Sequence, residues 1–245
     1  TIWLGRYKGL ASISHEGVLK EFIDDNRYGF PDYKLQSMHS TGDGSIWLGA
    51  RQILAQYSQS GNWTFLEGKG SGVPVNPEDQ DPEAINFMHR IGKDKILMGT
   101  YSGLFTFTPS SPGTKPVTLE GVQLDKPEYG AGFRQAVEDA TGNIWIATRQ
   151  GLIQRKPDGS FAYYSENNSG LPSNKLYDVA ITQKNILLVG TESGLARTAT
   201  DQVDFQVFQG EVTEDITVEE IKSLAVDKQG RAYFPITYSK NGGIV

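Results

Sequence analysis

The segment "GNIWIATRQGL", residues 142–152, joins a glycine turn, a short apolar run with a tryptophan, a polar corner and a Gly-Leu pair. Further copies are "TIWLGRYKGL" at 1–10, "GSIWLGARQIL" at 44–54, "DKILMGTYSGL" at 94–104, "NILLVGTESGL" at 185–195 and, more weakly, "RAYFPITYSKNGGI" at 231–244. We call the central apolar residue of each copy its anchor. The anchors are Trp3, Trp47, Leu97, Trp145, Leu188 and Tyr233, spaced by 44, 50, 48, 43 and 45 residues. A fixed period of this length indicates a repeat architecture.

Each period has the rhythm of four short strands, which we name A to D. The run "FRQAVEDA" at 133–140 leads through a Thr-Gly-Asn turn into the anchor strand. The runs "GLIQRKP" and "GSFAYYS" then meet at a Pro-Asp-Gly turn, residues 157–159. Such turn residues favour tight hairpins. The segment "TVEEIKSLAVD" at 217–227 is the best helix candidate, but its second half falls on strand A, so we predict a strand there.

This pattern predicts an all-β fold, a β-propeller of four-stranded antiparallel blades with 43–50 residues each. Helical repeats are excluded because the chain alternates apolar and polar residues and contains 28 glycines. We expect one propeller domain over residues 1–245, with strands B to D at the start, four complete periods, and strands A to C at the end. That makes five to six blades, which we expect to be a slice of a seven-bladed or tandem propeller. The anchors are expected to pack between neighbouring blades.

Composition excludes several kinds of function. The chain of 245 residues has a net charge of −6 without a basic stretch, so nucleic acid is not expected as a partner. The absence of cysteine removes disulfides, thiolate metal sites and a cysteine nucleophile. With no apolar run long enough to cross a bilayer, we expect no membrane contact in this segment. Because Thr1 stands inside a repeat, we expect a processed or excised segment whose targeting information is missing.

Two histidines occupy equivalent places in the repeat. His39 and His89 each lie eight residues before an anchor, so they share one strand-A position in successive blades. On innermost strands they could face the channel and share a metal. The other copies carry Val137, Ala180 and Ala225 there, which supplies no third ligand. We therefore predict that they are neighbours and that no metal binds.

No other constellation predicts chemistry. His15 is expected to be exposed in a C–D hairpin. The acidic runs "NPEDQDPE" at 76–83 and "EVTEDITVEE" at 211–220 fall in long D–A connections, where we expect solvated loops and keep a bound cation as the alternative. No Ser-His-Asp arrangement and no phosphate-binding loop are evident, so no catalytic residue and no cofactor are predicted.

The polar corner after each anchor strand is the candidate ligand-binding site. Propellers carry their B–C turns and D–A loops on one face, and loops on a rigid scaffold are where binding usually resides. The residue four after the anchor varies between copies: it is Tyr7, Arg51, Tyr101, Arg149 or Glu192. Tyrosine rings can stack on sugar faces and arginine can bind a carboxylate or sulfate bidentately. An acidic or neutral oligosaccharide is therefore the expected ligand, with a neighbouring protein domain second.

The phrase at 142–152, the subsequent Phe161–Tyr164 run and the Gly170–Asn174 loop together resemble the two-component regulator propeller repeat family. A second copy of the loop is "GFPDYKLQSM" at 29–38. The resemblance covers essentially the whole chain. It departs at Ile53, where the family has Gly, at Ala147, also in place of Gly, and at Pro235 inside the last anchor strand.

The resemblance implies the periplasmic or otherwise extracytoplasmic sensor region of a two-component histidine kinase of the hybrid type, membrane-anchored in the full-length protein and responding to glycan fragments. Its partners would be an oligosaccharide or adjacent domains of the same sensor, and a homodimer of the full-length protein is compatible with it. The repeat also occurs in a cell-surface scaffold of the Bacteroidetes secretion system, and a propeller lyase with a channel histidine as base is a third reading.

Overall fold

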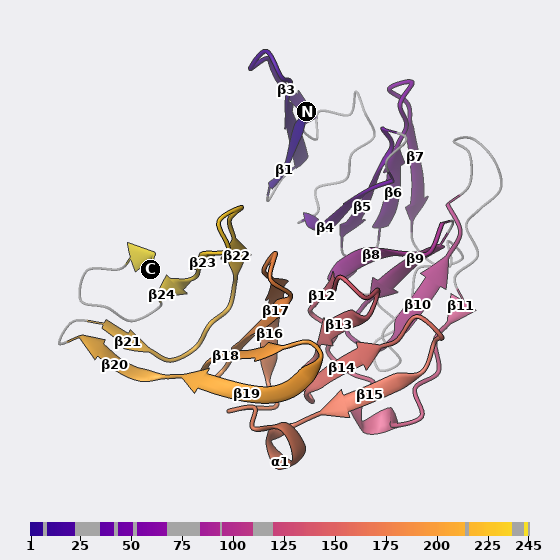
Figure 1. Cartoon of the computed structure of the whole chain (residues 1–245). Coiled ribbons are helices and arrows are strands. Elements are labelled where there is room, and N and C mark those ends of the chain that lie inside the picture. Colours follow the sequence, from indigo (N-terminus) through magenta and orange to yellow (C-terminus); the bar gives the residue numbers. More distant parts are fainter. Residues whose placement is uncertain are drawn as a thin grey trace. The chain divides into compact units, whose positions relative to one another are not determined.

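A computed structural model of the chain describes residues 1–6, 9–22, 35–41, 44–50, 53–67, 84–93, 95–109, 120–213, 216–236 and 243–244. The chain divides into two compact units, Thr1–Val122 and Gln123–Val245. Each unit is built from antiparallel sheets (Figure 1). Helix is confined, among the described residues, to a single turn at α1 (Glu166–Ser169) and a 3-10 turn at Pro127–Tyr129. The prediction of a single domain stays a prediction.

The sheets of the first unit keep chain order from strand to neighbouring strand. They are β1 (Ile2–Arg6), β2 (Gly9–Ile13) and β3 (Leu19–Phe22); β4 (Leu35–Ser40), β5 (Ile46–Ala50), β6 (Ile53–Tyr57) and β7 (Trp63–Glu67); and β8 (Phe87–Ile91), β9 (Lys95–Gly99), β10 (Leu104–Phe107) and β11 (Glu120–Gly121). The first sheet thus has strands B to D, and the next two have all four, as the period predicted.

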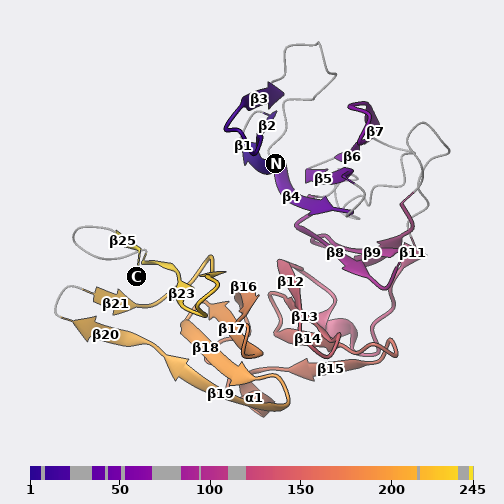
Figure 2. The same ribbon diagram turned by 45° about the horizontal axis from the view of Figure 1, so that its top comes forward.

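The second unit continues the same plan (Figure 2). Its four-stranded sheets are β12 (Gln135–Glu138), β13 (Ile144–Ala147), β14 (Leu152–Arg155) and β15 (Phe161–Tyr164), then β16 (Leu176–Ile181), β17 (Ile186–Thr191), β18 (Gly194–Ala199) and β19 (Gln202–Phe208). Two-stranded sheets come next: β20 (Gly210–Thr213) with β21 (Ile216–Val218), β22 (Ala225–Val226) with β23 (Ala232–Tyr233), and β24 (Pro235–Ile236) with β25 (Gly243–Ile244). The predicted all-β fold of antiparallel blades is confirmed.

The strand register confirms the alignment of the copies. In every blade with an A strand, the residue eight before the anchor faces the anchor across the A–B pair. The pairs are His39 with Trp47, His89 with Leu97, Val137 with Trp145, Ala180 with Leu188, and Ala225 with Tyr233. One sequence phrase therefore builds the same hairpin five times.

Neighbouring blades are joined by a repeated contact, which we call the blade joint. The residue twelve before an anchor donates its backbone N–H to the carbonyl three residues after the preceding anchor. The bonds are Ile85 to Ala50 at 3.4 Å, Leu176 to Thr148 at 2.9 Å and Ile221 to Thr191 at 2.9 Å. The donating residue lies over the small residue two after the preceding anchor. A β-carbon on Gly49 would lie 2.6 Å from Ile85 Cγ2, and one on Gly190 would lie 2.5 Å from the Ile221 carbonyl oxygen.

The anchors lie in the apolar layers that these joints create. Trp145 is fully buried in a cluster with Leu176 and Val189 of the next blade, and Trp47 is buried with Ile85 and Met98 of its next blade. The remaining anchors differ: Leu97 and Leu188 are buried, Trp3 is partly buried, and Tyr233 is 37% exposed. The anchors of the four complete four-stranded blades are therefore buried, whereas those of the first and last blades are partly buried or exposed.

The A–B turn before Trp145 is organised by one carboxylate. Asp139 accepts hydrogen bonds from Thr141 N (2.9 Å) and Oγ1 (2.7 Å), from Asn143 N (3.0 Å) and Nδ2 (2.8 Å), and from the buried Trp145 Nε1 (2.9 Å). Burial alone would raise the pKa of Asp139, but the hydrogen bonds from Thr141, Asn143 and Trp145 outweigh it and lower the pKa. Thr41 stands at the equivalent position before Trp47, and among the described residues the Trp47 indole N–H has no acceptor. The carboxylate thus serves both the turn and the buried anchor.

The last blade departs from the pattern for an identifiable reason. Pro235 lacks a backbone N–H, and the anchor strand is interrupted after Tyr233, so β23 pairs with β22 while β24 pairs with β25. No helix forms over 217–227, which confirms the prediction against a helix. The strand A predicted for its second half is the two residues of β22. The expectation of a solvated loop at 211–220 is wrong, because β20 and β21 pair as antiparallel strands over most of this stretch. The acidic run at 76–83 lies outside the described residues.

We predict that Gly190→Ala destabilises the protein by about 1–3 kcal/mol, because the added methyl would press on the Ile221 carbonyl and open a blade joint. Urea denaturation measures the loss. The matched control is Gly5→Ala at the same repeat position, where the nearest atom, Leu35 Cβ, is 3.4 Å away. Equal losses in the two variants would contradict the role of the joint.

Asp139→Ala is expected to cost about 2–4 kcal/mol of unfolding free energy, since it leaves a buried indole N–H and four other donors without their acceptor. The control is Asp158→Ala in an exposed hairpin, where the carboxylate serves Ser160 N and Oγ only. The loss in the control should be clearly smaller. A comparable loss would mean that Asp139 acts only as an ordinary turn residue.

Candidate functional site

The B–C turns present two residues each on a fixed frame. Three residues after the anchor, Thr148 donates its hydroxyl to the Gly151 carbonyl at 2.8 Å and accepts the Gln150 N–H at 2.9 Å. Thr191 repeats both contacts with Gly194 and Ser193, at 2.8 and 3.0 Å. At Gly151 φ is +126°, and a β-carbon would lie 2.5 Å from the Tyr164 carbonyl oxygen, so the turn requires glycine. The residues between the threonine and the glycine are held outward.

The structure accounts for three of the five predicted site residues. Tyr7 and Arg51 lie outside the described residues. Tyr101 belongs to the first unit and is 49% exposed. Arg149 and Glu192 belong to the second unit, are both exposed, and lie on the B–C turns of adjacent blades. The Arg149 stem lies against Gly132, where an added β-carbon would be 2.8 Å from Arg149 Cγ.

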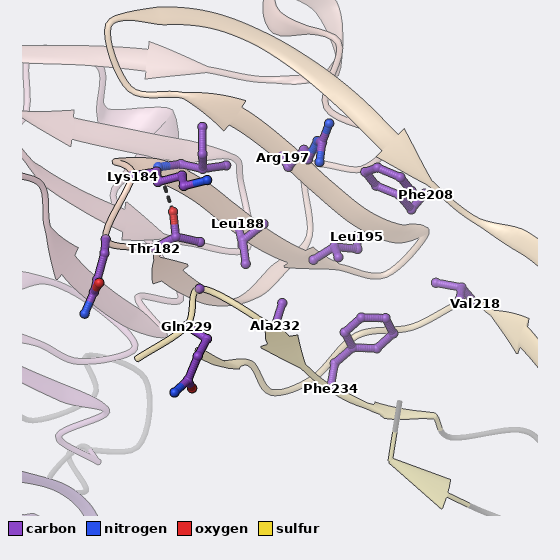
Figure 3. A pocket seen from close by; sticks show the side chains of 13 residues that line it. Thr182, Lys184, Leu188, Leu195, Arg197, Phe208, Val218, Gln229, Ala232 and Phe234 are labelled. Carbon is purple, nitrogen blue, oxygen red and sulfur yellow. Dashed lines mark hydrogen bonds between the residues drawn. The ribbon is translucent and has the colours of Figure 1, made fainter. Parts of the chain in front are cut away.

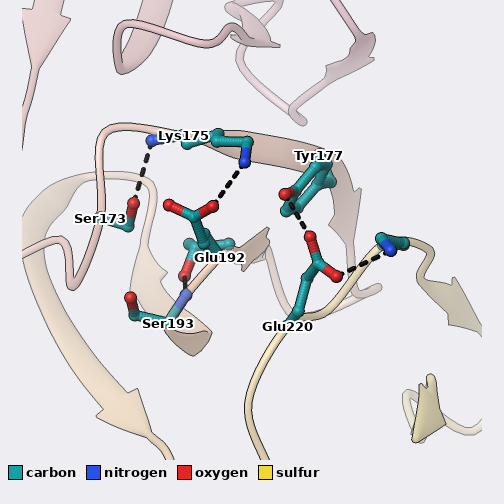
Figure 4. A network of polar contacts seen from close by, with 8 residues as sticks. Ser173, Lys175, Tyr177, Glu192, Ser193 and Glu220 are labelled. Carbon is teal, nitrogen blue, oxygen red and sulfur yellow. Dashed lines mark hydrogen bonds and ion pairs between the residues drawn. The ribbon is translucent and has the colours of Figure 1, made fainter. Parts of the chain in front are cut away.

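Glu192 does not stand alone on its turn. Its carboxylate forms an ion pair with Lys175 Nζ, and its backbone N–H donates to the Lys175 carbonyl at 3.0 Å (Figure 4). Lys175 Nζ also lies 5.6 Å from the centre of the Tyr177 ring. The hydrogen bond with Glu192 is the main cause of a raised pKa of Lys175, so the ammonium is held in its charged form.

The polar network continues onto the next segment of the chain (Figure 4). The Tyr177 hydroxyl donates to the Glu220 carboxylate, which also pairs with Lys222 at 2.7 Å. Burial first, and then the bond to Glu220, raises the pKa of Tyr177. The pairing with Lys222, and after it the Tyr177 bond, lowers the pKa of Glu220. The site therefore links two successive blades through charged side chains.

The sequence-based prediction placed the D–A loops on the same face but named site residues only from the B–C turns, so it missed these partners. Tyr177 is the extra residue of a β-bulge, since Leu176 pairs with Thr191 and Asp178 already pairs with Gly190. Bulges re-aim a side chain. The residue eleven before an anchor varies as much as the turn residue: it is Gln36, Asn86, Arg134, Tyr177 or Lys222. That variation was visible in the aligned copies and could have extended the predicted site.

We call the resulting surface of the second unit the loop face. It consists of Arg134, Arg149, Lys175, Tyr177, Glu192, Glu220 and Lys222. These seven residues comprise four cations and two carboxylates, and the exposed Glu166 and Glu219 lie on the same D–A segments. An aromatic ring between ion pairs can take part in stacking, while the cations favour an acidic group.

The two equivalent histidines lie on neighbouring A strands, β4 and β8, as predicted. Burial, and then the nearby charges of His89 and Arg90, lower the pKa of His39. Among the described residues, His39 Nε2 is buried without a hydrogen-bond partner, and no group of three His, Asp or Glu side chains is arranged to hold a metal. The absence of a metal therefore stays a prediction.

His15 lies in an exposed turn between β2 and β3, as expected.

Asp178, next to Tyr177, ties adjacent blades together. Its carboxylate accepts the N–H of Leu224 at 2.7 Å and that of Val179 at 2.8 Å. The equivalent residue, Ser37, donates its hydroxyl to the Ile85 carbonyl of its next blade at 2.7 Å. Burial dominates over these hydrogen bonds and raises the pKa of Asp178 to about 6.

The chain matches no protein-family model and no curated protein. Solved structures do resemble it. The extracellular domain of the putative hybrid two-component system BT3049 of Bacteroides thetaiotaomicron is 18% identical with a TM-score of 0.70, over 95% of this chain and 30% of that one. An inactive virginiamycin B lyase of Staphylococcus aureus with quinupristin is 12% identical with a TM-score of 0.65, over 94% and 71%. PorZ, a surface component of the type-IX secretion system of Porphyromonas gingivalis, is 13% identical with a TM-score of 0.63, over 92% and 35%.

These likenesses define the class: the chain has a β-propeller fold made of four-stranded antiparallel blades. Its structural neighbours include extracellular domains of Bacteroides one-component and hybrid two-component systems, and it spans about 30% of the length of such a domain. At these identities the likeness establishes the fold alone. None of the described helices is long and apolar enough to cross a membrane.

We predict that Asp178→Asn flattens the pH dependence of stability between about pH 4 and pH 6. The folded-state pKa of about 6 lies above the unfolded value of about 3.9, so in this window the folded state binds more protons and stability falls as pH rises. The wild type should lose about 2 kcal/mol across the window, whereas the amide of the variant cannot titrate.

Urea denaturation from pH 4 to 7 tests this. Asp158→Asn is the control, because hydrogen bonds from Ser160 lower the pKa of Asp158 and place its effect below the window. A wild-type slope retained in the Asp178 variant would contradict the assignment.

Proposed function

We propose that this chain is a non-catalytic recognition segment of a bacterial extracytoplasmic sensor whose full-length protein carries a histidine kinase, and that its loop face binds an acidic oligosaccharide. The observation that supports the sensor role is the likeness to extracellular domains of Bacteroides two-component systems. The observation that supports the ligand class is the group of four cations on the loop face of an acidic chain.

The physical argument for the ligand rests on what varies between blades. The threonine, the glycine and the blade joint recur, so the frame is constant, while the residues at the two outward positions differ in charge and size. A carboxylate or sulfate on a sugar could pair with Arg149 and Lys222, and the exposed edge of Tyr177 offers an apolar surface to a sugar ring. The existing ion pair of Lys222 with Glu220 would be exchanged for a pair with the ligand, which makes binding dependent on salt.

Calorimetric titration of the purified chain with uronate-containing, sulfated and neutral oligosaccharides tests the proposal. We expect acidic members to bind and the Arg149→Ala, Lys222→Ala double variant to lose about tenfold or more in affinity, since each charge-assisted contact contributes about 1.5–3 kcal/mol. The control is the Lys156→Ala, Lys228→Ala double variant, which removes the same charge from hairpin turns at the other end of the blades. The Tyr101→Ala variant, in the same titrations, tests whether the first unit also contributes to binding.

Equal loss in the two double variants would mean that net charge, and not the loop face, governs binding. Binding unaffected by either would place recognition elsewhere and overturn the proposed site. A neighbouring domain of the same sensor is the second candidate partner for this face.

A lyase is the second candidate function, because the chain covers 71% of a virginiamycin B lyase, more than it covers of the sensor domains. Mass spectrometry after incubation with quinupristin distinguishes the two: any enzyme-dependent product would refute the non-catalytic proposal. A surface scaffold like PorZ is a third. It predicts binding of another protein and none of the oligosaccharides.

A further inference from the structure

A cavity of about 550 Å³ lies in the second unit, between the sheet β16–β19 and the short strands that come after it (Figure 3). Its apolar wall is formed by Leu188, Leu195, Phe208, Val218 and Phe234. It reaches the A–B turns at Thr182 and Gly230, which lie at the opposite end of the blades from the loop face. It is therefore separate from the oligosaccharide site proposed above and of a volume common for small-molecule pockets.

The repeat explains why a cavity opens here. At the preceding junction the anchor is Trp145, whose indole fills the space and lies 5.7 Å from the Tyr164 ring. The register places Leu188 at the anchor position and Phe208 at that of Tyr164, since Leu195 faces Phe208 as Leu152 faces Tyr164. Leu188 packs in a cluster with Leu195 and Val218, with Phe234 against it, so the smaller anchor is covered and the cavity opens beside this cluster.

A second difference between the two blades adds a cation. Gln154 lies opposite Trp145, and its oxygen accepts the Tyr164 hydroxyl at 3.0 Å. Arg197 takes this position opposite Leu188, with its guanidinium 5.3 Å from the centre of the Phe208 ring. Arg197 donates from Nε and Nη2 to Gln206 Oε1 at 3.1 and 2.9 Å, which uses two of its five N–H groups.

The described charged side chains at the wall of the cavity are all cations. Arg197 and Lys184 lie at its wall, and both side chains belong to exposed residues. Neither forms an ion pair with a carboxylate among the described residues, and the described lining contains no Asp or Glu. In a chain of net charge −6, such a cluster favours an anion beside an apolar surface.

We propose that this cavity binds a small molecule with an apolar ring or branched body and one anionic group, a carboxylate, sulfate or phosphate. The body packs on Phe208 and Phe234, beside the cluster of Leu188 and Leu195. The anion pairs with the remaining N–H groups of Arg197, with Lys184 as a second cation. Arg197 stays oriented by Gln206 and by the Phe208 ring, so the pairing requires little reorganisation.

The test uses two fluorescent probes of similar shape, anionic 8-anilinonaphthalene-1-sulfonate and neutral N-phenyl-1-naphthylamine. We expect saturable binding of both at one site. Leu188→Trp, which restores the residue of the preceding junction, should weaken both probes by about tenfold or more by filling the cavity. Arg197→Gln, which restores Gln154 of that junction, should weaken the anionic probe by about tenfold and leave the neutral probe within about twofold. Lys156→Gln, equal in charge loss but outside the lining, should change neither.

Circular dichroism establishes that each variant keeps the wild-type fold. Anionic-probe binding that survives Arg197→Gln would overturn the anion assignment, and binding of either probe that survives Leu188→Trp would place it outside the cavity. Absence of saturable binding, or binding that weakens as sedimentation shows self-association, would mean that protein covers the cavity. That outcome also overturns the proposal. None of these results depends on oligosaccharide binding, so the two proposals fail separately.

Discussion

The structure depends on the joint between successive blades. A four-stranded sheet exposes two faces, and it is stable only when they are covered. At three junctions the cover is fixed by one backbone hydrogen bond and one close contact. The N–H of Ile85, Leu176 or Ile221 reaches a carbonyl just after the preceding anchor, and the donating residue lies over a small residue. The small residue is a glycine at 190, where an added β-carbon would lie 2.5 Å from the Ile221 carbonyl oxygen, and an alanine at 147. The most regular features of the repeat, the aliphatic anchor strand and its glycine, are thus explained by contact between blades.

The same joint gives the loop face its geometry. The carbonyl that receives the bond belongs to Thr148 or Thr191, and the hydroxyl of that threonine closes the B–C turn. A residue can vary between the threonine and the glycine without disturbing the packing, because it faces solvent. Variation in chemistry on a constant frame is what a recognition surface requires. The pairing of Lys175 with Glu192 shows that the outward residues of one blade act together.

The last blade shows the consequence of a weakened repeat pattern. Pro235 divides its anchor strand, Tyr233 is partly exposed, and Leu188 replaces an indole at the junction before it. Each change removes packing, and together they accompany an open apolar cavity beside Arg197. A departure from a repeat is therefore informative in two ways, as a loss of stability and as a place where a ligand can enter.

The sequence by itself determined the period, the strand order within each blade, the antiparallel register and the equivalence of His39 with His89. These features arise from local rules: alternation of apolar residues, tight-turn residues and a fixed spacing from each anchor. It also indicated the outward position of Arg149 and Glu192. Tertiary structure alone decided that a bulge turns Tyr177 toward Glu220, that Asp139 binds the Trp145 indole, and that β20 pairs with β21. The Tyr177–Glu220 bond joins atoms of different blades, which no local pattern of residues encodes. The other two features are local in sequence, but they depend on side-chain and strand geometry that the alternation and the turn residues leave open.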